Sequence, residues 1–387
     1  MRGGRTGGRE RALPLGLKKY MTREDTDMKK LRAGILGATG MVGQRFITLL
    51  SDHPWFELTT LAASPRSEGL TYEEAVEGRW KMDTPIPEKV RTMKVMNVND
   101  VEKVAATVDF VFSAVDMKKE EIKAIEEAYA KTETPVVSNN SAHRWTPDVP
   151  MVIPEINSDH YKVIDDQKKR LGTKNGFIAV KPNCSIQSYV PALEAWMPWE
   201  PYEAVITTYQ AISGAGKDFK SWPEMVENLI PYIGGEEAKS EDEPLKIWGH
   251  IENGEIVKGD QINITCQCLR VPVLNGHTAA CFVKFRKKAT KEELIKALEE
   301  YKGFPQENDL PMAPAQFIKY FEEDDRPQVK LDVDRDKGMG ISIGRLREDK
   351  IYDWKFIGLS HNTLRGAAGG GVLGAETLYK MGYIKEK

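Results

Sequence analysis

The feature that most constrains this chain is a glycine-rich turn between an expected strand and an expected helix. Leu31–Leu36 is a short apolar run that predicts a buried strand, and residues 41–50 carry apolar side chains at helical spacing. The turn itself reads Gly37-Ala-Thr-Gly40-Met-Val-Gly43. Glycines there let the backbone turn tightly and approach a pyrophosphate at the N-terminus of the helix. The strand–turn–helix context favours a dinucleotide site over glycines that serve packing alone.

Two patterns of secondary structure follow one another along the chain. Strands are predicted at residues 58–63, 108–115 and 135–138, and a helix at 118–130 lies between the last two. This alternation indicates a parallel, doubly wound sheet. The length of 387 residues leaves room for a second domain.

After Cys184 the pattern changes to long alternating segments, which are typical of a sheet with one exposed face. These segments cover residues 204–211, 261–273 and 277–285. Thr290 followed by two glutamates predicts the start of a helix that runs to Tyr301. A final helix is predicted over residues 365–381, and the polar stretch 234–243 is interpreted as a loop or the edge of a helix.

Composition excludes several classes of protein. The chain has 55 basic and 58 acidic residues, so its net charge of −3 gives no reason to expect nucleic acid or a membrane surface as a partner. No apolar run approaches the ~18 residues that a membrane helix needs. We expect a protein that acts on small molecules.

The cysteines favour a reducing compartment. There are only four, Cys184, Cys266, Cys268 and Cys281, which argues against a disulfide scaffold and suggests the cytoplasm. Cys266 and Cys268 stand two apart in a strand-like run and therefore share one face of the sheet. Their spacing is not the C-x-x-C of a zinc or redox site, so we expect core packing and no metal.

The first 28 residues are basic and rich in glycine and arginine, with no apolar segment of a signal peptide. A flexible extension, an expression artefact or a misassigned start at Met21 or Met28 all fit this stretch. We exclude it from the predicted fold.

The end of the second strand indicates which cofactor is bound. An NAD site usually places Asp or Glu there to bind the ribose 2′-hydroxyl. This chain reads Ala63-Ser64-Pro65-Arg66-Ser67 instead. Arg66 could hold a phosphate by charge and planar hydrogen bonds, with the two serines adding donors. The alternative is a solvated loop arginine, but the absence of an acid favours NADP.

A candidate nucleophile lies at a later strand–helix junction. Lys181-Pro182-Asn183-Cys184-Ser185 connects the apolar residues 177–180 to a helix expected to begin near Ser185. A thiol at a helix N-terminus has a lowered pKa, and the backbone N–H groups there can receive an oxyanion. A buried inert cysteine is the alternative. The position at such a junction in an open α/β sheet favours function.

Arg270 and His277 stand seven residues apart around a Pro…Asn-Gly turn. An arginine in an otherwise apolar strand needs an anionic partner. A histidine beside it would supply the acid and base that a cysteine nucleophile requires. Together the two residues suggest a carboxylate clamp next to a proton shuttle.

These residues resemble the aspartate-semialdehyde dehydrogenase family, in particular its archaeal and fungal branch. The resemblance runs from about Leu31 to the C-terminus. It rests on seven ordered motifs: Gly37-Ala-Thr-Gly-Met-Val-Gly43, Ala63-Ser-Pro-Arg-Ser67, Pro182-Asn-Cys-Ser185, Gln210-Ala-Ile-Ser-Gly-Ala-Gly216, Ile233-Gly-Gly-Glu-Glu-Ala-Lys239, Arg270-Val-Pro-Val-Leu-Asn-Gly-His277 and Asn362-Thr-Leu-Arg-Gly-Ala-Ala-Gly-Gly370.

The resemblance implies roles in catalysis. Cys184 would attack the substrate, His277 would be the general acid and base, and Gln210 would orient the substrate at the thioester. The same family pattern has an aspartate where this chain has His361, a departure expected to affect cofactor contacts only.

It also implies a substrate site. Arg270 would hold the α-carboxylate and Glu236 the α-amino group. Glu236 is preferred over Glu237 because its spacing to Lys239 puts both on one helix face, although a surface ion pair would show the same spacing. The phosphate pocket would consist of Asn183, Lys239 and Arg144. The implied cofactor contacts are Gly37, Thr39, Gly40, Met41, Val42, Ser64, Arg66, Ser67, Ser113, Ser213, Gly214 and Asn362.

The fold implied is a Rossmann-like NADP-binding domain joined to an α+β catalytic and dimerisation domain with a mostly antiparallel sheet, similar to glyceraldehyde-3-phosphate dehydrogenase. We place the first domain at residues 29–183, completed by the C-terminal helix at 363–387, and the second at residues 184–362. A homodimer or homotetramer is expected.

The reaction implied is the NADPH-dependent reduction of L-aspartyl 4-phosphate to L-aspartate 4-semialdehyde and phosphate, which feeds lysine, threonine and methionine synthesis. Malonyl-CoA reductase, built on the same scaffold, is the alternative. Glu236 and Lys239 argue against it because malonyl-CoA has no α-amino group. A non-catalytic NADP-binding regulator would leave the cysteine, glutamine, arginine and histidine without a purpose.

Overall fold

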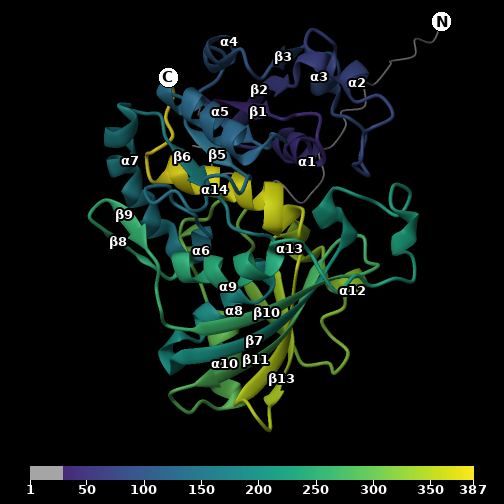
Figure 1. The fold of residues 1–387 in the computed structure, drawn as a ribbon, viewed down its shortest axis with the longest axis vertical. Coiled ribbons are helices and arrows are strands. Elements are labelled where there is room, and N and C mark those ends of the chain that lie inside the picture. The colour runs from purple at the N-terminus through teal and green to yellow at the C-terminus, as the bar shows by residue number, and fades with distance from the viewer. Residues whose placement is uncertain (1–28) are drawn as a thin grey trace, which may run out of the picture.

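The computed structural model describes residues 29–387, so the interpretation of residues 1–28 lies outside it. The described chain forms two six-stranded sheets, stacked along the long axis of the molecule with the N-terminal sheet above the C-terminal one in Figure 1. No helix in this part of the chain is both long and apolar enough to cross a membrane.

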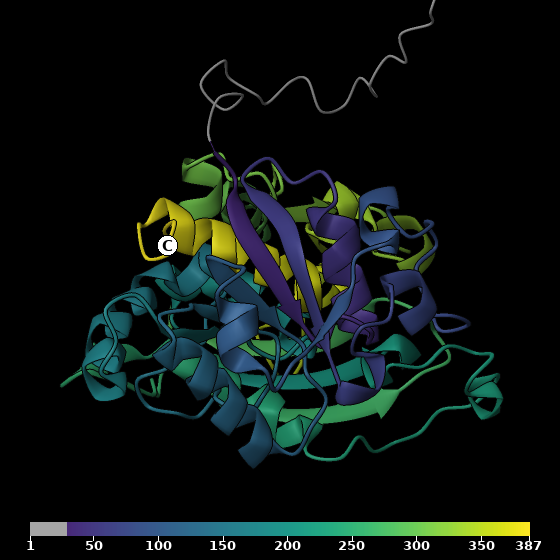
Figure 2. The same cartoon turned by 90° about the horizontal axis from the view of Figure 1, so that it is seen from above.

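The first sheet is parallel throughout, as predicted, with the strand order β3-β2-β1-β4-β5-β6. Its strands are β1 (Leu31–Leu36), β2 (Phe56–Ala63), β3 (Val95–Asn97), β4 (Phe110–Ser113), β5 (Val136–Ser138) and β6 (Ile178–Val180). The view from above in Figure 2 shows helices on both sides of these strands. Because both faces are covered, the strands are apolar runs rather than alternating ones.

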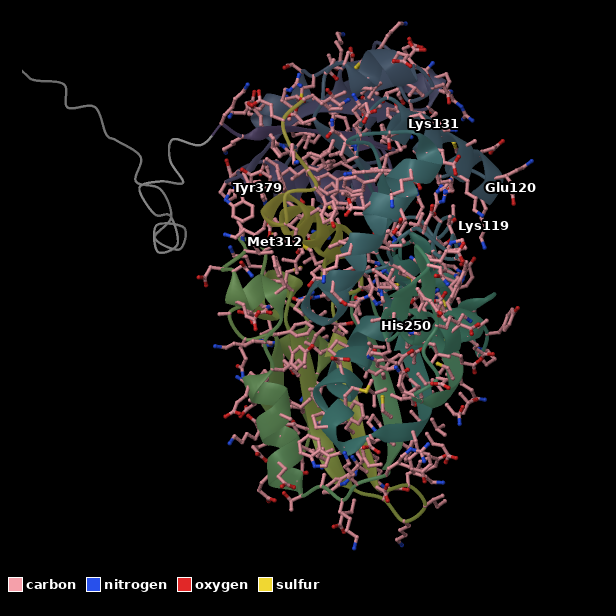
Figure 3. All side chains as sticks on the ribbon, turned by 90° about the vertical axis from the view of Figure 1, so that its left-hand side faces the viewer. Lys119, Glu120, Lys131, His250, Met312 and Tyr379 are labelled. Carbon is pink, nitrogen blue, oxygen red and sulfur yellow. The ribbon has the colours of Figure 1, made fainter. Side chains whose placement is uncertain are left out.

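Several helices accompany this sheet, and the longest of them is amphipathic. They are α1 (Met41–Leu50), α2 (Tyr72–Ala75), α3 (Glu88–Arg91), α4 (Val101–Ala105), α5 (Lys119–Lys131) and α7 (Ile164–Leu171). In α5, Ile122, Ile125 and Tyr129 are buried at helical spacing, whereas Lys119, Glu120 and Lys131 are exposed (Figure 3). Each large apolar side chain buried in this way contributes about 1.5–3 kcal/mol.

The last helix returns from the second sheet to the first. α14 (Gly369–Lys380) packs against α1 and β5 and crosses the middle of the molecule in Figure 1. The prediction of one helix from residue 365 is wrong at its start, because residues 364–368 form a distorted wide turn in which Ala367 is not helical. Gly366 in this turn passes against Cys184, where a Cβ atom would lie 2.7 Å from the cysteine Cβ.

The second sheet is mixed, with the strand order β10-β7-β11-β14-β13-β12. The three central pairs are antiparallel, as predicted, and the two outer pairs are parallel. The strands are β7 (Pro201–Gln210), β10 (Asn263–Arg270), β11 (His277–Phe285), β12 (Ile318–Phe321), β13 (Ile341–Glu348) and β14 (Trp354–Ser360). Cys266 and Cys268 are buried on one face, with Sγ atoms 3.7 Å apart, which confirms core packing.

Helices and a hairpin complete this half. They are α6 (Pro154–Asn157), α8 (Val190–Ala195), α9 (Glu236–Ile247), α10 (Lys291–Glu300), α11 (Phe304–Glu307), α12 (Val329–Asp332) and α13 (Arg335–Gly338), with β8 (His250–Glu252) and β9 (Glu255–Val257). Thr290 caps α10 as predicted, since its hydroxyl accepts from Glu293 N at 3.2 Å and the Glu293 carboxylate accepts from Thr290 N at 2.8 Å.

Residues 234–243, interpreted as a loop or the edge of a helix, contain the start of α9, which begins at Glu236 and takes up most of the stretch. The helix packs against β10, yet it buries Glu236, Ser240 and Glu243 rather than an apolar stripe. These polar side chains have partners inside the protein, as described below. A helix whose buried face is polar has no apolar periodicity for sequence analysis to detect.

Candidate active site

The predicted site residues converge because neighbouring parallel strands end at one edge of the first sheet. Leu36 pairs with both Ala62 and Ser113, and Ser138 pairs with both Ser113 and Val180. The loops after β1, β2, β4, β5 and β6 therefore leave the same edge. The strand order reverses between β1 and β4, which is where ligands bind in open α/β sheets.

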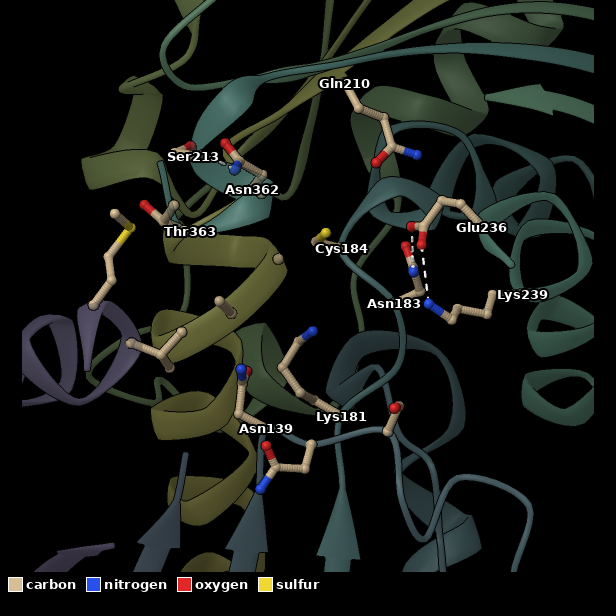
Figure 4. A pocket seen from close by; sticks show the side chains of 18 of the residues that line it. Asn139, Lys181, Asn183, Cys184, Gln210, Ser213, Glu236, Lys239, Asn362 and Thr363 are labelled. Carbon is tan, nitrogen blue, oxygen red and sulfur yellow. Dashed lines mark hydrogen bonds and ion pairs between the residues drawn. The ribbon is translucent and has the colours of Figure 1, made fainter. Parts of the chain in front are cut away.

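A cavity of about 320 Å³ opens between this edge and the second sheet. Figure 4 shows Cys184 near its centre, with Asn362 and Ser213 on one side and Glu236, Lys239 and Asn183 on the other. The predicted residues that line it are Met41, Val42, Arg144, Asn183, Cys184, Gln210, Ser213, Gly214, Glu236, Lys239, Arg270 and Asn362.

The glycine turn has the geometry of a phosphate cradle. Gly37 has a φ of +84°, and a Cβ atom there would lie 2.3 Å from the carbonyl oxygen of Ala114. A Cβ atom on Gly43 would lie 2.3 Å from the carbonyl oxygen of Gly37. Gly40 precedes α1, and no heavy atom outside its chain neighbours comes within 3.6 Å of its Cβ position. The N-terminus of α1 is therefore open to a phosphate group.

Arg66 lies in a short turn directly after β2, beside the glycine turn. It is exposed, as is Ser64, whereas Ser67 is buried. Among the described residues no carboxylate lies within 4 Å of the Arg66 guanidinium, so its charge is free for an anion. Ser113, at the end of β4, is fully buried and accepts a hydrogen bond from Asn140 Nδ2 at 3.2 Å.

Cys184 and His277 form a close pair. The cysteine Sγ lies 3.3 Å from Nε2 of the histidine. Nδ1 of His277 accepts a hydrogen bond from the backbone N–H of Ala211 at 3.1 Å, so the neutral ring carries its proton on Nε2, facing the sulfur. Burial, followed by the charge of Arg270, lowers the pKa of His277 to about 3. The imidazole is therefore neutral at physiological pH and donates to the sulfur.

The expectation that a helix N-terminus lowers the pKa of Cys184 is wrong for the free protein. Ser185–Ser188 form a single 3₁₀ turn, and α8 begins only at Val190. Burial, followed by the charge of Glu236, raises the pKa of the thiol, and the charges of Lys181, Arg144 and Arg270 only partly oppose this. One turn carries little of the dipole of a long helix, so desolvation dominates.

Arg270 and Gln210 end two adjacent strands and are paired in the register of β10 with β7. The Nη1 atom of Arg270 donates to the carbonyl oxygen of Ala211 at 2.6 Å, and no carboxylate of residues 29–387 lies within 4 Å of the guanidinium. Gln210 Nε2 donates to Thr208 Oγ1 at 3.2 Å. Gly214 packs closely against this pair, because a Cβ atom there would lie 3.0 Å from Arg270 Nη1.

Glu236 receives hydrogen bonds from two predicted site residues. Asn183 Nδ2 donates to one carboxylate oxygen, and Lys239 Nζ donates to the other at 3.1 Å (Figure 4). Glu236 is only 7% exposed and lies in the cavity wall, so the pair is not a surface ion pair. Glu237 instead accepts from the N–H of Cys268, outside the cavity.

Two residues that the sequence analysis did not single out complete this wall. Glu243 Oε1 lies 2.9 Å from Arg144 Nη1, and its Oε2 accepts from the backbone N–H of Asn183 at 2.6 Å. Lys181 lines the cavity below Cys184. A signal was present for both, since Glu243 stands two helical turns after Glu236 and Lys181 precedes the Pro-Asn-Cys motif.

Hydrogen bonds hold Asn362, the first residue of the last motif, and the preceding His361. Asn362 Nδ2 donates to Ser213 Oγ at 2.8 Å, and its Oδ1 accepts from Gly276 N at 2.8 Å. His361 Nδ1 accepts from the N–H groups of Thr363 and Leu364 at 3.2 and 3.3 Å. Burial, followed by the charge of Arg45, lowers the pKa of His361 to about 4. The neutral imidazole of His361 thus accepts hydrogen bonds from backbone N–H groups, as the carboxylate of an aspartate could at this position.

Comparison with known proteins gives a consistent result. Residues 32–164 match the model described as "Semialdehyde dehydrogenase, NAD binding domain", and residues 191–365 match the corresponding dimerisation domain. An aspartate-semialdehyde dehydrogenase of Methanothermobacter thermautotrophicus is 40% identical over 91% of this chain and 99% of its own length. One from Saccharomyces cerevisiae is 39% identical over 91% of this chain and 98% of its own length.

Among solved structures, the aspartate semialdehyde dehydrogenase of Candida albicans, determined with NADP, has a TM-score of 0.83 and 38% identity. The match covers 92% of this chain and all of that one.

Proposed function

The chain belongs to the aspartate-semialdehyde dehydrogenase family, and from this premise we propose that it reduces L-aspartyl 4-phosphate to L-aspartate 4-semialdehyde with NADPH, reversibly. The observation that carries the proposal is the Cys184–His277 pair at 3.3 Å, between a phosphate-accepting glycine turn and the unpaired cation of Arg270. The buried carboxylate of Glu236 favours an amino-acid substrate over malonyl-CoA, which has no ammonium group for it.

The proposed substrate has three charged groups, and the cavity has a residue or set of residues of complementary charge for each. Arg270 would bind the α-carboxylate, because its planar fork matches two oxygens and it holds no carboxylate of its own. Glu236 would accept the α-ammonium group. The phosphate group would lie toward Asn183, Lys239 and Arg144. These contacts would hold the acyl carbon beside Cys184.

The chemistry proceeds through a thioester. The Cys184 thiol gives its proton to solvent, the thiolate attacks the acyl carbon, the C–O bond to phosphate breaks, and phosphate leaves with the bonding electron pair. This covalent route divides one difficult step into two easier ones. Gln210 projects from the end of β7 into the cavity, where it would orient the acyl group.

The cofactor, when bound, supplies the hydride that reduces the thioester carbon. His277 Nε2–H already points at the sulfur, so it is placed to hydrogen-bond the oxygen on the adjacent carbon as negative charge develops there. If the ring takes up a second proton from solvent at Nδ1, it can pass the Nε2 proton to that oxygen and remain neutral. It would take the proton back as the C–S bond breaks and the aldehyde is released. Its hydrogen bond from Ala211 fixes the ring for both steps.

The residues around the glycine turn fit a phosphorylated dinucleotide. The N-terminus of α1 is open to the pyrophosphate, and Thr39, Gly40, Met41 and Val42 surround it. Arg66, with Ser64 and Ser67, would bind the 2′-phosphate. Asn362, Ser213 and Gly214 would contact the nicotinamide half.

The variant Arg66→Ala should raise the KM for NADPH on the order of 10–100-fold while changing the KM for NADH little. The reason is that only NADPH carries the 2′-phosphate, and a charge-assisted hydrogen bond is worth roughly 1.5–3 kcal/mol. Steady-state kinetics with both cofactors measures the difference. Arg79, whose guanidinium donates to a helix carbonyl, provides a control, since Arg79→Ala should not discriminate between cofactors.

The function itself is tested by reduction of NADP in the presence of aspartate semialdehyde and inorganic phosphate. The proposal requires activity that depends on all three compounds. Faster turnover of malonyl-CoA with NADPH would replace it with the CoA reductase alternative. NADP binding without turnover of either substrate would indicate a regulator.

Arg270→Lys should be damaging although it keeps the charge. Lysine lacks the planar fork and cannot reach the carboxylate with two parallel bonds, so the KM for aspartate semialdehyde should rise about tenfold or more. The KM for NADP should stay within about twofold, because Arg270 lies on the substrate side of Cys184. An equal rise in both constants would contradict a carboxylate clamp.

We further propose the domain division at residues 29–183 and 184–362, with the first domain completed by residues 363–387. The match to a dimerisation domain supports assembly of copies of this chain, as a homodimer or homotetramer. A role in lysine, threonine and methionine synthesis in the cytoplasm follows from the proposed reaction.

A further inference from the structure

A buried lysine, Lys181, lines the cavity. Lys181 follows β6 and is only 6% exposed. Its ammonium donates to the carbonyl oxygen of Pro182, and no carboxylate of the described residues lies within 4 Å of it. An ammonium group has three donors, and buried lysines are almost always paired. Lys181 therefore retains charge and donors for a ligand.

The side chain is directed at the reacting centre. In Figure 4 it extends from the lower part of the cavity with its nitrogen toward Cys184, and Asn139 lies beside it. It shares the cavity lining with Asn183 and Arg144. An anion bound next to the sulfur would therefore meet this ammonium group.

Two of the other cations near Cys184 are paired with carboxylates. Arg144 lies 2.9 Å from Glu243, and Lys239 lies 3.1 Å from Glu236. Arg270 donates only to a carbonyl oxygen, but it stands at the position proposed for the α-carboxylate. The remaining cavity cation, Arg45, projects from α1 on the side of the glycine turn. Among the described residues, Lys181 is therefore the cation beside Cys184 that has no carboxylate within 4 Å and no other proposed role.

We propose that Lys181 is the principal cation for the phosphate group, binding the leaving phosphate in one direction and inorganic phosphate in the other. The inference rests on the proposed function and sharpens it, since Lys239 and Arg144 would then have secondary roles. A lysine suits this position because its compact charge can follow the phosphate as the C–O bond breaks.

The charge of Lys181 gives phosphate binding a distinctive pH dependence. Burial, followed by the charge of Arg144, lowers the pKa of Lys181 to about 7, while Cys184, Glu243 and Glu236 oppose this shift. Arg365, which also borders this lysine, is neutralised by Glu155 at 2.7 Å. As the pH rises through about 7, the free ammonium loses its proton, so the lysine contribution to phosphate affinity should fall. Lys181→Arg should remove this dependence, because arginine stays charged.

The test uses full-length protein in the phosphate-dependent oxidation of aspartate semialdehyde. Lys181→Met should raise the KM for phosphate on the order of 10–100-fold, the loss expected for one charge-assisted contact. The KM values for aspartate semialdehyde and NADP should change less than about threefold. The rise in the KM for phosphate should be larger in Lys181→Met than in Lys239→Met. The KM for phosphate of the wild type, divided by that of Lys181→Arg, should rise with pH.

A second measurement does not depend on turnover. Sodium phosphate should raise the Tm of the wild type by binding the native state, and Lys181→Met should lose that shift. Lys246→Met is the matched control, because Lys246 is 2% exposed, does not line the cavity and donates only to the backbone carbonyls of Arg144, Thr146 and Val149; its phosphate shift should remain.

An unchanged phosphate KM and Tm shift in Lys181→Met would overturn the inference, as would a larger effect of Lys239→Met. A wild-type protein whose Tm is unchanged by phosphate would also overturn the inference. If Lys181→Met fails to fold, the pH dependence of Lys181→Arg decides. A wild type that binds phosphate but does not turn over aspartate semialdehyde would refute the proposed function and leave the Lys181 result standing.

Discussion

Cys184→Ser is expected to lose turnover by on the order of 10³-fold or more, because a serine hydroxyl is a far weaker nucleophile than a thiolate and the thioester cannot form. The substitution removes little volume, and the contacts of Asn183 and Glu236 around it remain. The measurement is kcat for phosphate-dependent NADP reduction, with circular dichroism to check the fold. Cys266→Ser, in the core of the second sheet, serves as the control and should keep its turnover.

Alkylation gives an independent test of the same assignment. Cys184 is half-buried and faces the cavity, whereas the other three cysteines are at most 5% exposed, so iodoacetamide should modify Cys184 first. Burial raises the pKa of the Cys184 thiol, so its thiolate fraction is small at neutral pH and grows as the pH rises. The labelling rate should therefore increase steadily above pH 7. Earlier labelling of another cysteine, with an active Cys184→Ser enzyme, would refute the mechanism.

His277→Asn is expected to lower kcat about 10²–10⁴-fold, the usual contribution of general acid–base catalysis. Asparagine Oδ1 can still accept the N–H of Ala211, so the fold is retained while the proton carrier at Nε2 is removed. The KM for aspartate semialdehyde should change little, since His277 is not assigned to a charged group of the substrate. Rates of the wild type and variant should be compared from pH 6 to pH 9.

His277→Gln separates proton transfer from simple hydrogen bonding. Its amide N–H can reach the sulfur as a donor but cannot exchange a proton at physiological pH. A loss of kcat as large as in His277→Asn would support proton transfer. Recovery of most of the wild-type kcat would instead mean that the imidazole acts only as a hydrogen-bond donor to Cys184.

The polar helix α9 shows where sequence analysis reaches its limit in the fold. The parallel strands and α10 were predictable because their apolar periodicity and capping residues are local signals. In α9 most of the buried positions are polar, and Glu236 and Glu243 among them have partners far along the chain, such as Arg144 and Asn183. A buried face of that kind lacks apolar periodicity, and the partners of its side chains are set only by the tertiary structure.

The residues of the candidate site likewise fall into those that the sequence identified and those that it did not. The glycine turn, Arg66, Cys184, Arg270 and His277 were identified from the sequence because each lies in a motif whose residue types suit a particular chemistry. Lys181 was not singled out, although it lies three residues before Cys184. Its significance comes from its burial and from the absence of a carboxylate near it in the described structure, and both are properties of packing.

The sequence by itself determined the fold class and the candidates for the reacting groups, because strand, turn and helix signals and the order of motifs are encoded in neighbouring residues. Only the tertiary structure decided the protonation states of those groups. The thiol of Cys184 has a raised pKa, His277 is neutral with its proton on Nε2, and Lys181 has a pKa of about 7. Desolvation and Coulomb interactions depend on which distant segments surround a group, and that arrangement exists only in the folded chain.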